Sequence, residues 1–177
     1  EVLVECEDEG IAAEAAERAQ MLSFGALWLP PMREIEAKIG GLPRAEQVRV
    51  DRQLPSTLRI VVEPRSPVAV VEQGDRLMVI DVEGVCLHWT GSVPDKLPRV
   101  KIENAGRLSV GETIGSRNVE MMNAVRSGLD ETNLLRGARI DLSKPVRVEV
   151  VTSDGVVGKL GNRELLHEKA LLFGKLL

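Results

Sequence analysis

Two runs of alternating apolar residues, separated by a short break, constrain the fold of this chain more than any other feature. The positions that recur with period two are Val48, Val50 and Leu54 in the first run and Leu58, Ile60 and Val62 in the second. Successive side chains of a β-strand point to opposite faces, so each run predicts a strand with one buried face. The Gln-Leu-Pro-Ser break between the runs is typical of a turn. The pattern therefore predicts two strands joined by a turn.

The sequence before these strands predicts one more strand and two helices. Glu1 to Cys6 alternates as a half-buried strand does, and two stretches of helical spacing follow it. The residues expected to face inward are Ile11, Ala15, Ala19 and Leu22 in the first helix and Met32, Ile35 and Ile39 in the second. Prolines make Trp28 to Pro31 extended, and Gly40-Gly41 ends the second helix. The predicted order is β-α-α-β-β.

A second set of elements begins after Ser66-Pro67, because proline disrupts a strand ladder and new strands start directly behind it. This predicts two domains, residues 1–66 and 67–177. The expected strands of the second domain are Val68 to Val71, Leu77 to Ile80, Val85 to His88, Val100 to Ile102, Ala138 to Leu142, Val146 to Val151 and Val156 to Leu160. The predicted fold class is α+β, with a mixed, largely antiparallel β domain after the first module.

Two helices are expected in the second domain. The first covers Asn118 to Leu129, and the second opens behind Asn162 as N-cap. The residues that the last helix is expected to bury are Leu166, Ala170, Phe173 and Leu177. Asp154-Gly155 is a strong hairpin signal and leads into the strand Val156 to Leu160.

Composition argues against a nucleic-acid partner. The net charge is -4, only 2% of the residues are aromatic and there is no Tyr. Without a basic cluster the chain lacks the electrostatic footprint of a phosphate-binding protein. Without aromatic residues it cannot build repeated stacking platforms.

The sequence also lacks the parts of an enzyme site. Its two histidines belong to no HExxH or GxSxG pattern, and no Walker A or GxGxxG sequence is present. We therefore expect no catalysis, no cofactor, no metal and no small-molecule substrate. The alternative is an unrecognised site built from Asp81 and Glu83 near His88, with Trp89 as its neighbour. His167 is expected on a solvated helix face.

Two buried apolar thiols are expected at Cys6 and Cys86, with a disulfide between them as the alternative.

The stretch that joins the two predicted domains resembles the corresponding junction in the FtsQ/DivIB family of bacterial cell division proteins. The matching positions are Arg52, Leu54-Pro55, Leu58, Ile60, Glu63, Arg65 and Pro67-Val68-Ala69, the last of which complete an E-x-R-x-P-V-A signature. Farther on, the matching positions are Ile80-Asp81 with Gly84-Val85, Leu97-Pro98, and Asp154-Gly155 with Leu160-Gly161. The resemblance spans nearly the whole chain.

This resemblance implies a POTRA domain followed by an FtsQ-type β domain. It further implies a non-enzymatic scaffold that lies outside the cytoplasmic membrane, held by a transmembrane helix preceding this chain, and that binds FtsB/FtsL (DivIC)-type partners by β-strand addition. The alternative is a POTRA-containing assembly or secretion module of an outer-membrane system. In the family, another strand follows the last helix and forms the partner-binding edge, so the β domain is expected to lack its last strand here.

Strand addition needs an open sheet edge, which offers unpaired N–H and C=O groups. If the last strand is missing, the strand Val156 to Leu160 becomes such an edge. The candidate partner-binding residues are Val156, Val157, Gly158, Lys159 and Leu160 there, and Val48, Val50 and Arg52 on the first module.

Overall fold

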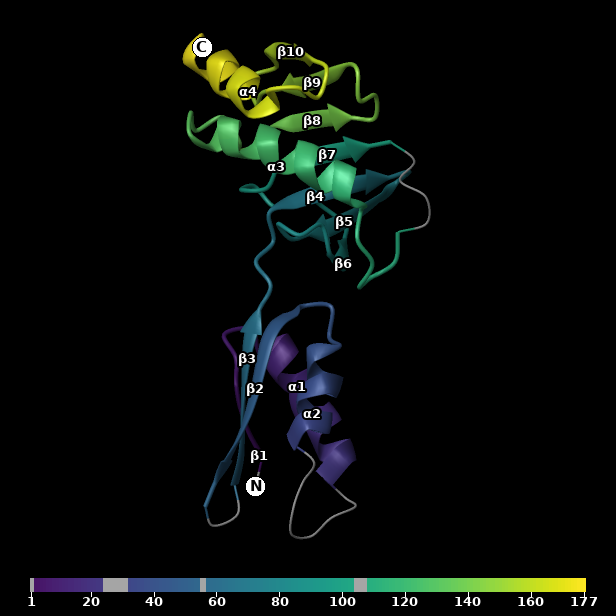
Figure 1. The fold of residues 1–177 in the computed structure, drawn as a ribbon, viewed down its shortest axis with the longest axis vertical. Helices are drawn as coiled ribbons and strands as arrows, with labels where there is room; N and C mark the ends of the chain where they lie inside the picture. Colours follow the sequence, from purple (N-terminus) through teal and green to yellow (C-terminus); the bar gives the residue numbers. More distant parts are fainter. Residues whose placement is uncertain (1, 24–31, 55–56, 104–107) are drawn as a thin grey trace. The chain divides into compact units, whose positions relative to one another are not determined.

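The computed structural model of the chain describes residues 2–23, 32–54, 57–103 and 108–177 (Figure 1). The chain divides into two compact units, Glu1–Arg65 and Ser66–Leu177. The division therefore falls one residue before the position expected from Ser66-Pro67. Among the described residues, no helix combines the length and the apolar character needed to cross a bilayer.

The described part of the first unit contains three strands and two helices. They are β1 (Val2–Glu5), α1 (Glu9–Ser23), α2 (Met32–Gly40), β2 (Ala45–Gln53) and β3 (Thr57–Pro64). The sheet order is β1-β3-β2, with β1 parallel and β2 antiparallel to the central β3. The β-α-α-β-β order predicted from periodicity is confirmed.

Both helices cover one face of this sheet (Figure 1). The core consists of Ile11, Ala15, Ala19, Ile35, Ile39, Leu42, Ala45, Val50, Leu58, Ile60 and Val62. Two predicted inward positions are wrong. Met32 is 41% exposed because it is the first residue of α2, and Leu54 is 85% exposed because β2 ends at Gln53. The side chain of Leu22 and the segment Trp28 to Pro31 lie outside the described residues.

An ion pair joins the two parallel strands of this sheet. Arg59 on β3 donates two hydrogen bonds to the carboxylate of Glu5 on β1, of 2.9 and 2.6 Å. These hydrogen bonds hold the pKa of Glu5 below its usual range, with a further contribution from the charge of Arg59.

The Glu5 carboxylate should make the stability of the first unit depend on pH. A carboxyl whose pKa is lowered on folding stabilises the protein above its unfolded pKa, and the stabilisation is lost as the pH falls through the folded value. We expect Glu5→Gln to remove that part of the acid dependence. Chemical unfolding of the parent and the variant at several acidic pH values would measure it, and parallel pH curves for the two proteins would contradict the assignment.

Outside residues 104–107, the second unit contains seven strands and two helices. They are β4 (Ala69–Gln73), β5 (Arg76–Ile80), β6 (Cys86–Thr90), β7 (Arg99–Ile102), α3 (Ser116–Asp130), β8 (Arg139–Leu142), β9 (Val148–Val151), β10 (Val157–Gly161) and α4 (Leu166–Lys175). The sheet order is β10-β9-β8-β7-β4-β5-β6. Only the β4–β7 and β7–β8 pairs are parallel. The predicted α+β class, with a mixed and largely antiparallel sheet, is confirmed.

Helices α3 and α4 lie side by side on one face of this sheet (Figure 1). The main core forms between them and the sheet, and its largest fully buried side chains include Met78, Ile80, Met122, Leu129, Ile140 and Leu142. A smaller cluster of Val70, Val79 and Leu87 lies on the opposite face and packs against Val93 and Leu97 of the loop before β7. The helices that the structure describes thus cover one face of the sheet only.

The turn between β5 and β6 explains the Asp-x-x-Gly part of the family resemblance. Asp81 is only 2% exposed, and its Oδ1 accepts hydrogen bonds from the backbone N–H groups of Glu83, at 3.0 Å, and Val85, at 2.7 Å. Gly84 has φ of 77°, a conformation that favours glycine. A Cβ at this position would also lie 2.4 Å from Val119 of α3. Both residues serve the turn.

The start of α4 differs from the prediction. Asn162 is not the N-cap; Leu165 occupies that position with φ of 52°. The side-chain oxygen of Asn162 instead accepts a 2.7 Å hydrogen bond from Lys169 Nζ. Leu166 and Ala170 are buried as predicted, Phe173 is half-buried, and Leu177 is exposed because α4 ends at Lys175.

His167 joins the two helices of this unit. Its Nδ1 lies 2.9 Å from Ser127 Oγ on α3, and its Nε2 lies 3.4 Å from Glu131 Oε1. The predicted solvated position is wrong, because the ring is half-buried in the seam between α3 and α4.

Candidate partner-binding edges

β10 is the terminal strand of the seven-stranded sheet in the part of the chain that the structure describes. It pairs with β9 alone, with Val157 opposite Val151 and Lys159 opposite Glu149. The strand predicted from Val156 to Leu160 thus lies at a sheet edge.

The hairpin turn determines which peptide groups of β10 point away from β9. Thr152 donates its N–H to the carbonyl of Val156, and Gly155 donates to the carbonyl of Thr152, both at 3.0 Å. This is a three-residue turn with Gly155 at φ of 85°. Hydrogen-bonded and non-hydrogen-bonded pairs alternate along an antiparallel ladder. Consequently Gly158 bonds to β9, whereas Val157 and Lys159 direct their N–H and C=O groups outward.

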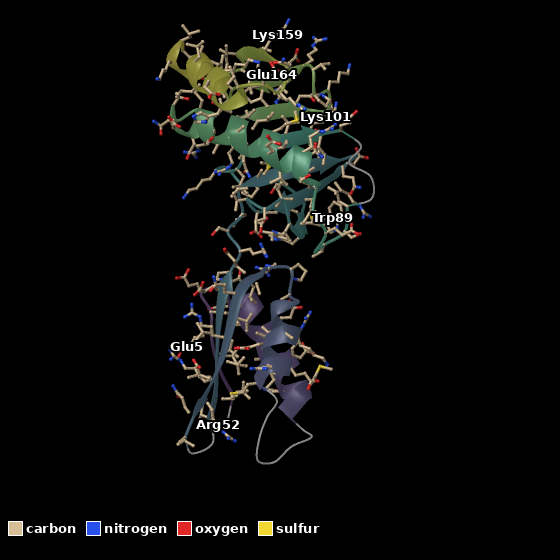
Figure 2. All side chains as sticks on the ribbon, viewed as in Figure 1. Glu5, Arg52, Trp89, Lys101, Lys159 and Glu164 are labelled. Carbon is tan, nitrogen blue, oxygen red and sulfur yellow. The ribbon has the colours of Figure 1, made fainter. Side chains whose placement is uncertain are left out.

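The two faces of β10 differ in character. Gly158 and Leu160 face α4, and a Cβ on Gly158 would lie only 2.8 Å from the ring of Phe173. Val157, 53% exposed, and Lys159, labelled in Figure 2, lie on the opposite face. Val156, just before the strand, is also exposed. Glycine is needed at 158 because the aromatic ring of α4 rests directly on the strand.

Helix α4 adds an apolar stripe that the sequence analysis did not identify. Leu172 and Leu176 are exposed and share one side of the helix, since they lie four positions apart. Leu165 is also exposed, but it precedes the helix in a left-handed conformation and lines a pocket with Met121 of α3. The side with His167, Ala170 and Leu171 meets α3. Leu172 and Leu176 turn away from α3, and α4 is the outer helix at the β10 end of the sheet (Figure 1). An exposed apolar stripe therefore flanks the open edge. The signal in the sequence that could have identified it is the spacing of four between Leu172 and Leu176.

The other candidate edge is β2, which among the described strands pairs only with β3. Val48 is half-buried, Val50 is buried and Arg52, labelled in Figure 2, is exposed. The N–H of Val50 points away from β3 and donates a 3.0 Å hydrogen bond to Glu36 Oε1 on α2. The middle of this edge is thus already occupied by a side chain of the same unit. No sequence pattern marked Glu36.

The first half of β6, at the far end of the large sheet, is covered by a loop. Cys86 donates its N–H to the carbonyl of Glu112 and accepts a hydrogen bond from Gly111, both at 2.8 Å. Val85 and Thr113 continue this pairing as an isolated bridge. β10 has no such cover within the described residues.

The residues of the alternative catalytic reading do not form a site. Asp81 is used by its turn, as described above, and His88 is exposed on β6. Trp89 is half-buried, with the Arg76 guanidinium 5.5 Å from its ring centre. Within the described ranges, no three His, Cys, Asp or Glu side chains converge to hold a metal ion.

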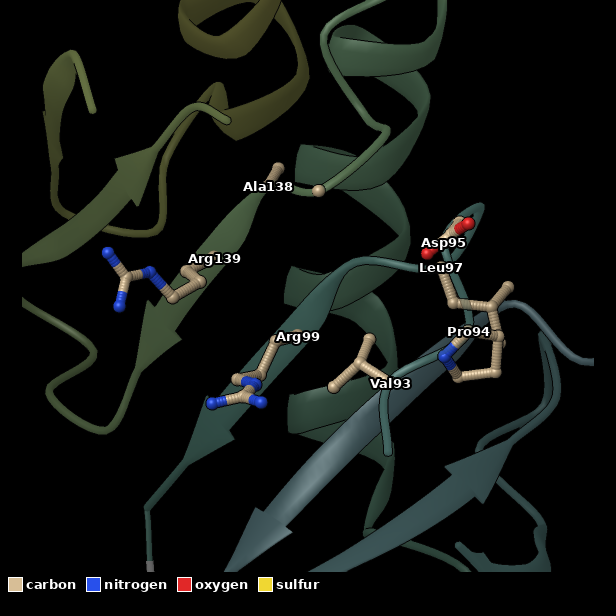
Figure 3. Close-up of a pocket in the computed structure, with 8 residues that line it drawn as sticks. Val93, Pro94, Asp95, Leu97, Arg99, Ala138 and Arg139 are labelled. Carbon is tan, nitrogen blue, oxygen red and sulfur yellow. The ribbon is translucent and has the colours of Figure 1, made fainter. Parts of the chain in front are cut away.

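A pocket of about 370 Å³ lies on the helix-free face of the large sheet (Figure 3). It is lined by Val93, Pro94, Asp95, Leu97, Arg99, Gly137, Ala138 and Arg139. Arg99 is paired with Glu72 at 3.2 Å, and Asp95 is the single carboxylate of the lining. Asp95 has no second carboxylate, histidine, cysteine or hydroxyl beside it in this lining, so the pocket offers no acid–base pair and no activated nucleophile.

Both cysteines carry free thiols, so the alternative of a disulfide is not realised in this structure. Cys6 is half-buried and Cys86 is buried. Burial raises the pKa of the Cys86 thiol to about 11, and the carboxylates of Glu112 and Asp81 act in the same direction.

We expect a thiol reagent at mildly alkaline pH to modify Cys6 and to leave Cys86 unmodified until the second unit unfolds, because the thiolate is the reactive form. The folded state favours the neutral thiol of Cys86, so this contribution to stability is complete below the unfolded pKa and is lost as the pH rises through about 11. Peptide mapping after labelling, with and without denaturant, measures both sites. Rapid labelling of Cys86 in the native protein would contradict this expectation.

No protein-family model matches the chain. The cell division protein FtsQ of Koribacter versatilis is 30% identical to it over 134 residues, which cover 72% of this chain and 38% of that protein. The cell division protein DivIB of Clostridium acetobutylicum is 27% identical over 131 residues, which cover 67% of this chain and 52% of that protein. The chain belongs to the FtsQ/DivIB family. The family resemblance drawn from the E-x-R-x-P-V-A junction is thereby confirmed.

This FtsQ/DivIB chain therefore spans between about two fifths and one half of the length of these relatives. The solved extracytoplasmic domain of DivIB from Geobacillus stearothermophilus is 17% identical, with a TM-score of 0.41, and the similarity covers 60% of this chain and 85% of that one.

Proposed function

We propose that this FtsQ/DivIB chain is a non-enzymatic scaffold of the bacterial divisome that binds other division proteins by strand addition at β10. Membership of a family of cell division proteins supports the cellular role. The edge geometry supports the mode of binding, because a partner strand can pair with β10 without displacing any described element.

The observation that carries this proposal is the set of outward peptide groups on β10. The N–H groups of Val157 and Lys159 point away from β9. Within the described residues, neither N–H group donates a hydrogen bond to another acceptor. Unpaired backbone groups at a sheet edge are a template for another strand. A strand placed here would also contact the leucine stripe of α4, so burial of apolar surface would add to the main-chain hydrogen bonds.

The partners that fit are FtsB/FtsL (DivIC)-type division proteins, as the family resemblance implies. The same resemblance supports an extracytoplasmic position, with the chain held at the cell membrane by a transmembrane helix that precedes it. Strand addition requires only backbone groups and packing surfaces, so this function needs no catalytic residue.

Among the candidate residues, we assign Val156 to Leu160 to partner binding in preference to Val48, Val50 and Arg52. The reason is that Glu36 occupies the edge at Val50.

Replacing Lys159 by proline tests the proposal. Proline lacks the N–H, and at an edge position whose N–H faces solvent it removes only the donor offered to a partner. In the full-length protein we expect Lys159→Pro to weaken binding of an FtsB/FtsL-type partner by about tenfold, from one lost hydrogen bond and the clash of the ring with the incoming strand. Lys159→Ala keeps the N–H and is the matched control.

Binding can be measured by titration with a fluorescent partner peptide. Hydrogen exchange of the Val157 and Lys159 amides gives a second readout, because partner binding should slow both. Equal affinity for the proline and alanine variants would overturn the proposal. So would amides at both positions that are already as protected in the free monomer as those of the central strands.

A further inference from the structure

β2 is a long edge strand, and a hydrogen bond from its backbone to a side chain blocks pairing at its centre. β2 covers nine residues and lies at the end of its sheet. Long edge strands tend to pair with another chain unless something blocks them. Here the block is a carboxylate, because Glu36 Oε1 accepts the outward N–H of Val50 at 3.0 Å. Val50 lies in the middle of the strand.

The sequence around Val50 is complementary to a second copy of itself when the two strands run antiparallel. The sequence from Gln47 to Gln53 reads Gln-Val-Arg-Val-Asp-Arg-Gln. If a second copy pairs with β2 about a two-fold axis at Val50, Arg49 of each copy lies opposite Asp51 of the other. Gln47 then lies opposite Gln53. Opposite charges directly across two antiparallel strands stabilise the pair.

The backbone also fits this register. Val50 directs its N–H and C=O away from β3, so in the two-fold arrangement each Val50 N–H would meet the Val50 carbonyl of the other copy. A C2 pair of this kind uses the same patch on both molecules. The N–H of Val50 is a single donor, so it cannot serve both Glu36 and the second copy fully.

We propose that β2 of one molecule pairs with β2 of a second copy of this chain, and that the hydrogen bond from Val50 to Glu36 prevents this pairing. With the carboxylate on Val50, the chain stays unpaired at β2. When the carboxylate leaves, two copies join into one continuous sheet centred on Val50. This pairing is separate from partner binding at β10.

The first experiment compares Glu36→Ala with Glu36→Gln, both in the Lys159→Pro background so that β10 does not pair. Alanine removes the acceptor, whereas glutamine keeps an oxygen at the same place. In sedimentation equilibrium we expect the alanine variant to dimerise at least about tenfold more tightly than the parent, since a charge-assisted hydrogen bond no longer competes. The glutamine variant keeps an acceptor without the charge and should dimerise more tightly than the parent but more weakly than the alanine variant.

Hydrogen exchange shows whether the hydrogen bond between Val50 and Glu36 was removed. The Val50 amide of the alanine variant should exchange faster than that of the parent at low concentration and should become protected as the protein concentration rises. Unfolding curves for the first unit show that the variant is still folded. A folded alanine variant that stays monomeric, or a Val50 amide with unchanged exchange, would overturn the proposal.

The second experiment tests the register. In the alanine background, Arg49→Asp alone places aspartates opposite each other and Asp51→Arg alone places arginines opposite each other, so each should dimerise about tenfold more weakly. A mixture of the two restores opposite charges at both positions and should form a heterodimer. Failure of the mixture to associate excludes pairing centred on Val50. Neither experiment contains an FtsB/FtsL-type partner, so their outcome is independent of the proposed scaffold function.

Discussion

A Gly128→Ala variant is expected to lose about 3 kcal/mol or more of the free energy of unfolding of the Ser66–Leu177 unit. A Cβ at position 128 would lie 2.5 Å from the carbonyl oxygen of His167 and 2.9 Å from both the Cβ of Ala170 and the backbone nitrogen of Leu171. Two of these three atoms belong to the backbone of α4. A side chain can rotate away, but α4 can relieve the clash only by moving off α3.

This expectation opposes helix propensity, which makes it informative. Alanine in place of an interior helical glycine normally stabilises by about 1 kcal/mol. Gly40, at the end of α2, is the matched control because a Cβ there would have no atom within 4 Å. Gly40→Ala should therefore leave its unit equally or slightly more stable. Denaturant unfolding followed by a probe in each unit would measure both changes, and a stable Gly128→Ala protein would show that α3 and α4 are less closely packed than described.

An Asp81→Ala variant is expected to lose about 2–3 kcal/mol, because two backbone N–H groups in the β5–β6 turn lose their acceptor. The affected donors are Glu83 and Val85, at 3.0 and 2.7 Å from Asp81 Oδ1. Since Asp81 is almost fully buried, water cannot readily replace the carboxylate. The turn also positions Gly84 under Val119 of α3, so its loss should affect the helix packing as well.

Asp81→Asn is the control for this prediction. Asparagine keeps an Oδ1 atom of the same geometry, so it can accept both backbone hydrogen bonds and should recover most of the stability. Thermal or denaturant unfolding of the three proteins measures the difference. If the asparagine and alanine variants are equally destabilised, the charge of Asp81 rather than its hydrogen bonds holds the turn.

Periodicity predicted the interior of most elements and failed at their ends. Ile35, Ile39, Ile60 and Val62 are buried where the spacing placed them, because only the core-facing side of a helix or strand satisfies that spacing. Leu54 follows the same alternation but lies one residue beyond β2, so no neighbour covers it. At α4, Lys169 competes for the side chain of Asn162, and the helix begins after Leu165. Such terminal contacts are tertiary and have no local signal.

The candidate site was predictable only in part, for the same reason. The hairpin signal Asp154-Gly155 and the alternation behind it located the edge strand. The bond from Val50 to Glu36 joins residues fourteen positions apart on different elements, so it depends on how α2 packs on the sheet. The contact of His167 with Ser127 is of the same kind, across forty positions.

The position of β7 between β4 and β8 has a consequence for how this unit folds. β4, β5 and β6 form one group of strands that are neighbours in sequence, and β8, β9 and β10 form another. Each group can assemble through short hairpins, whereas both parallel pairings of β7 must close longer stretches of chain. Local contacts form faster than distant ones. We therefore expect two meanders to appear early and the insertion of β7 between them to set the rate of folding.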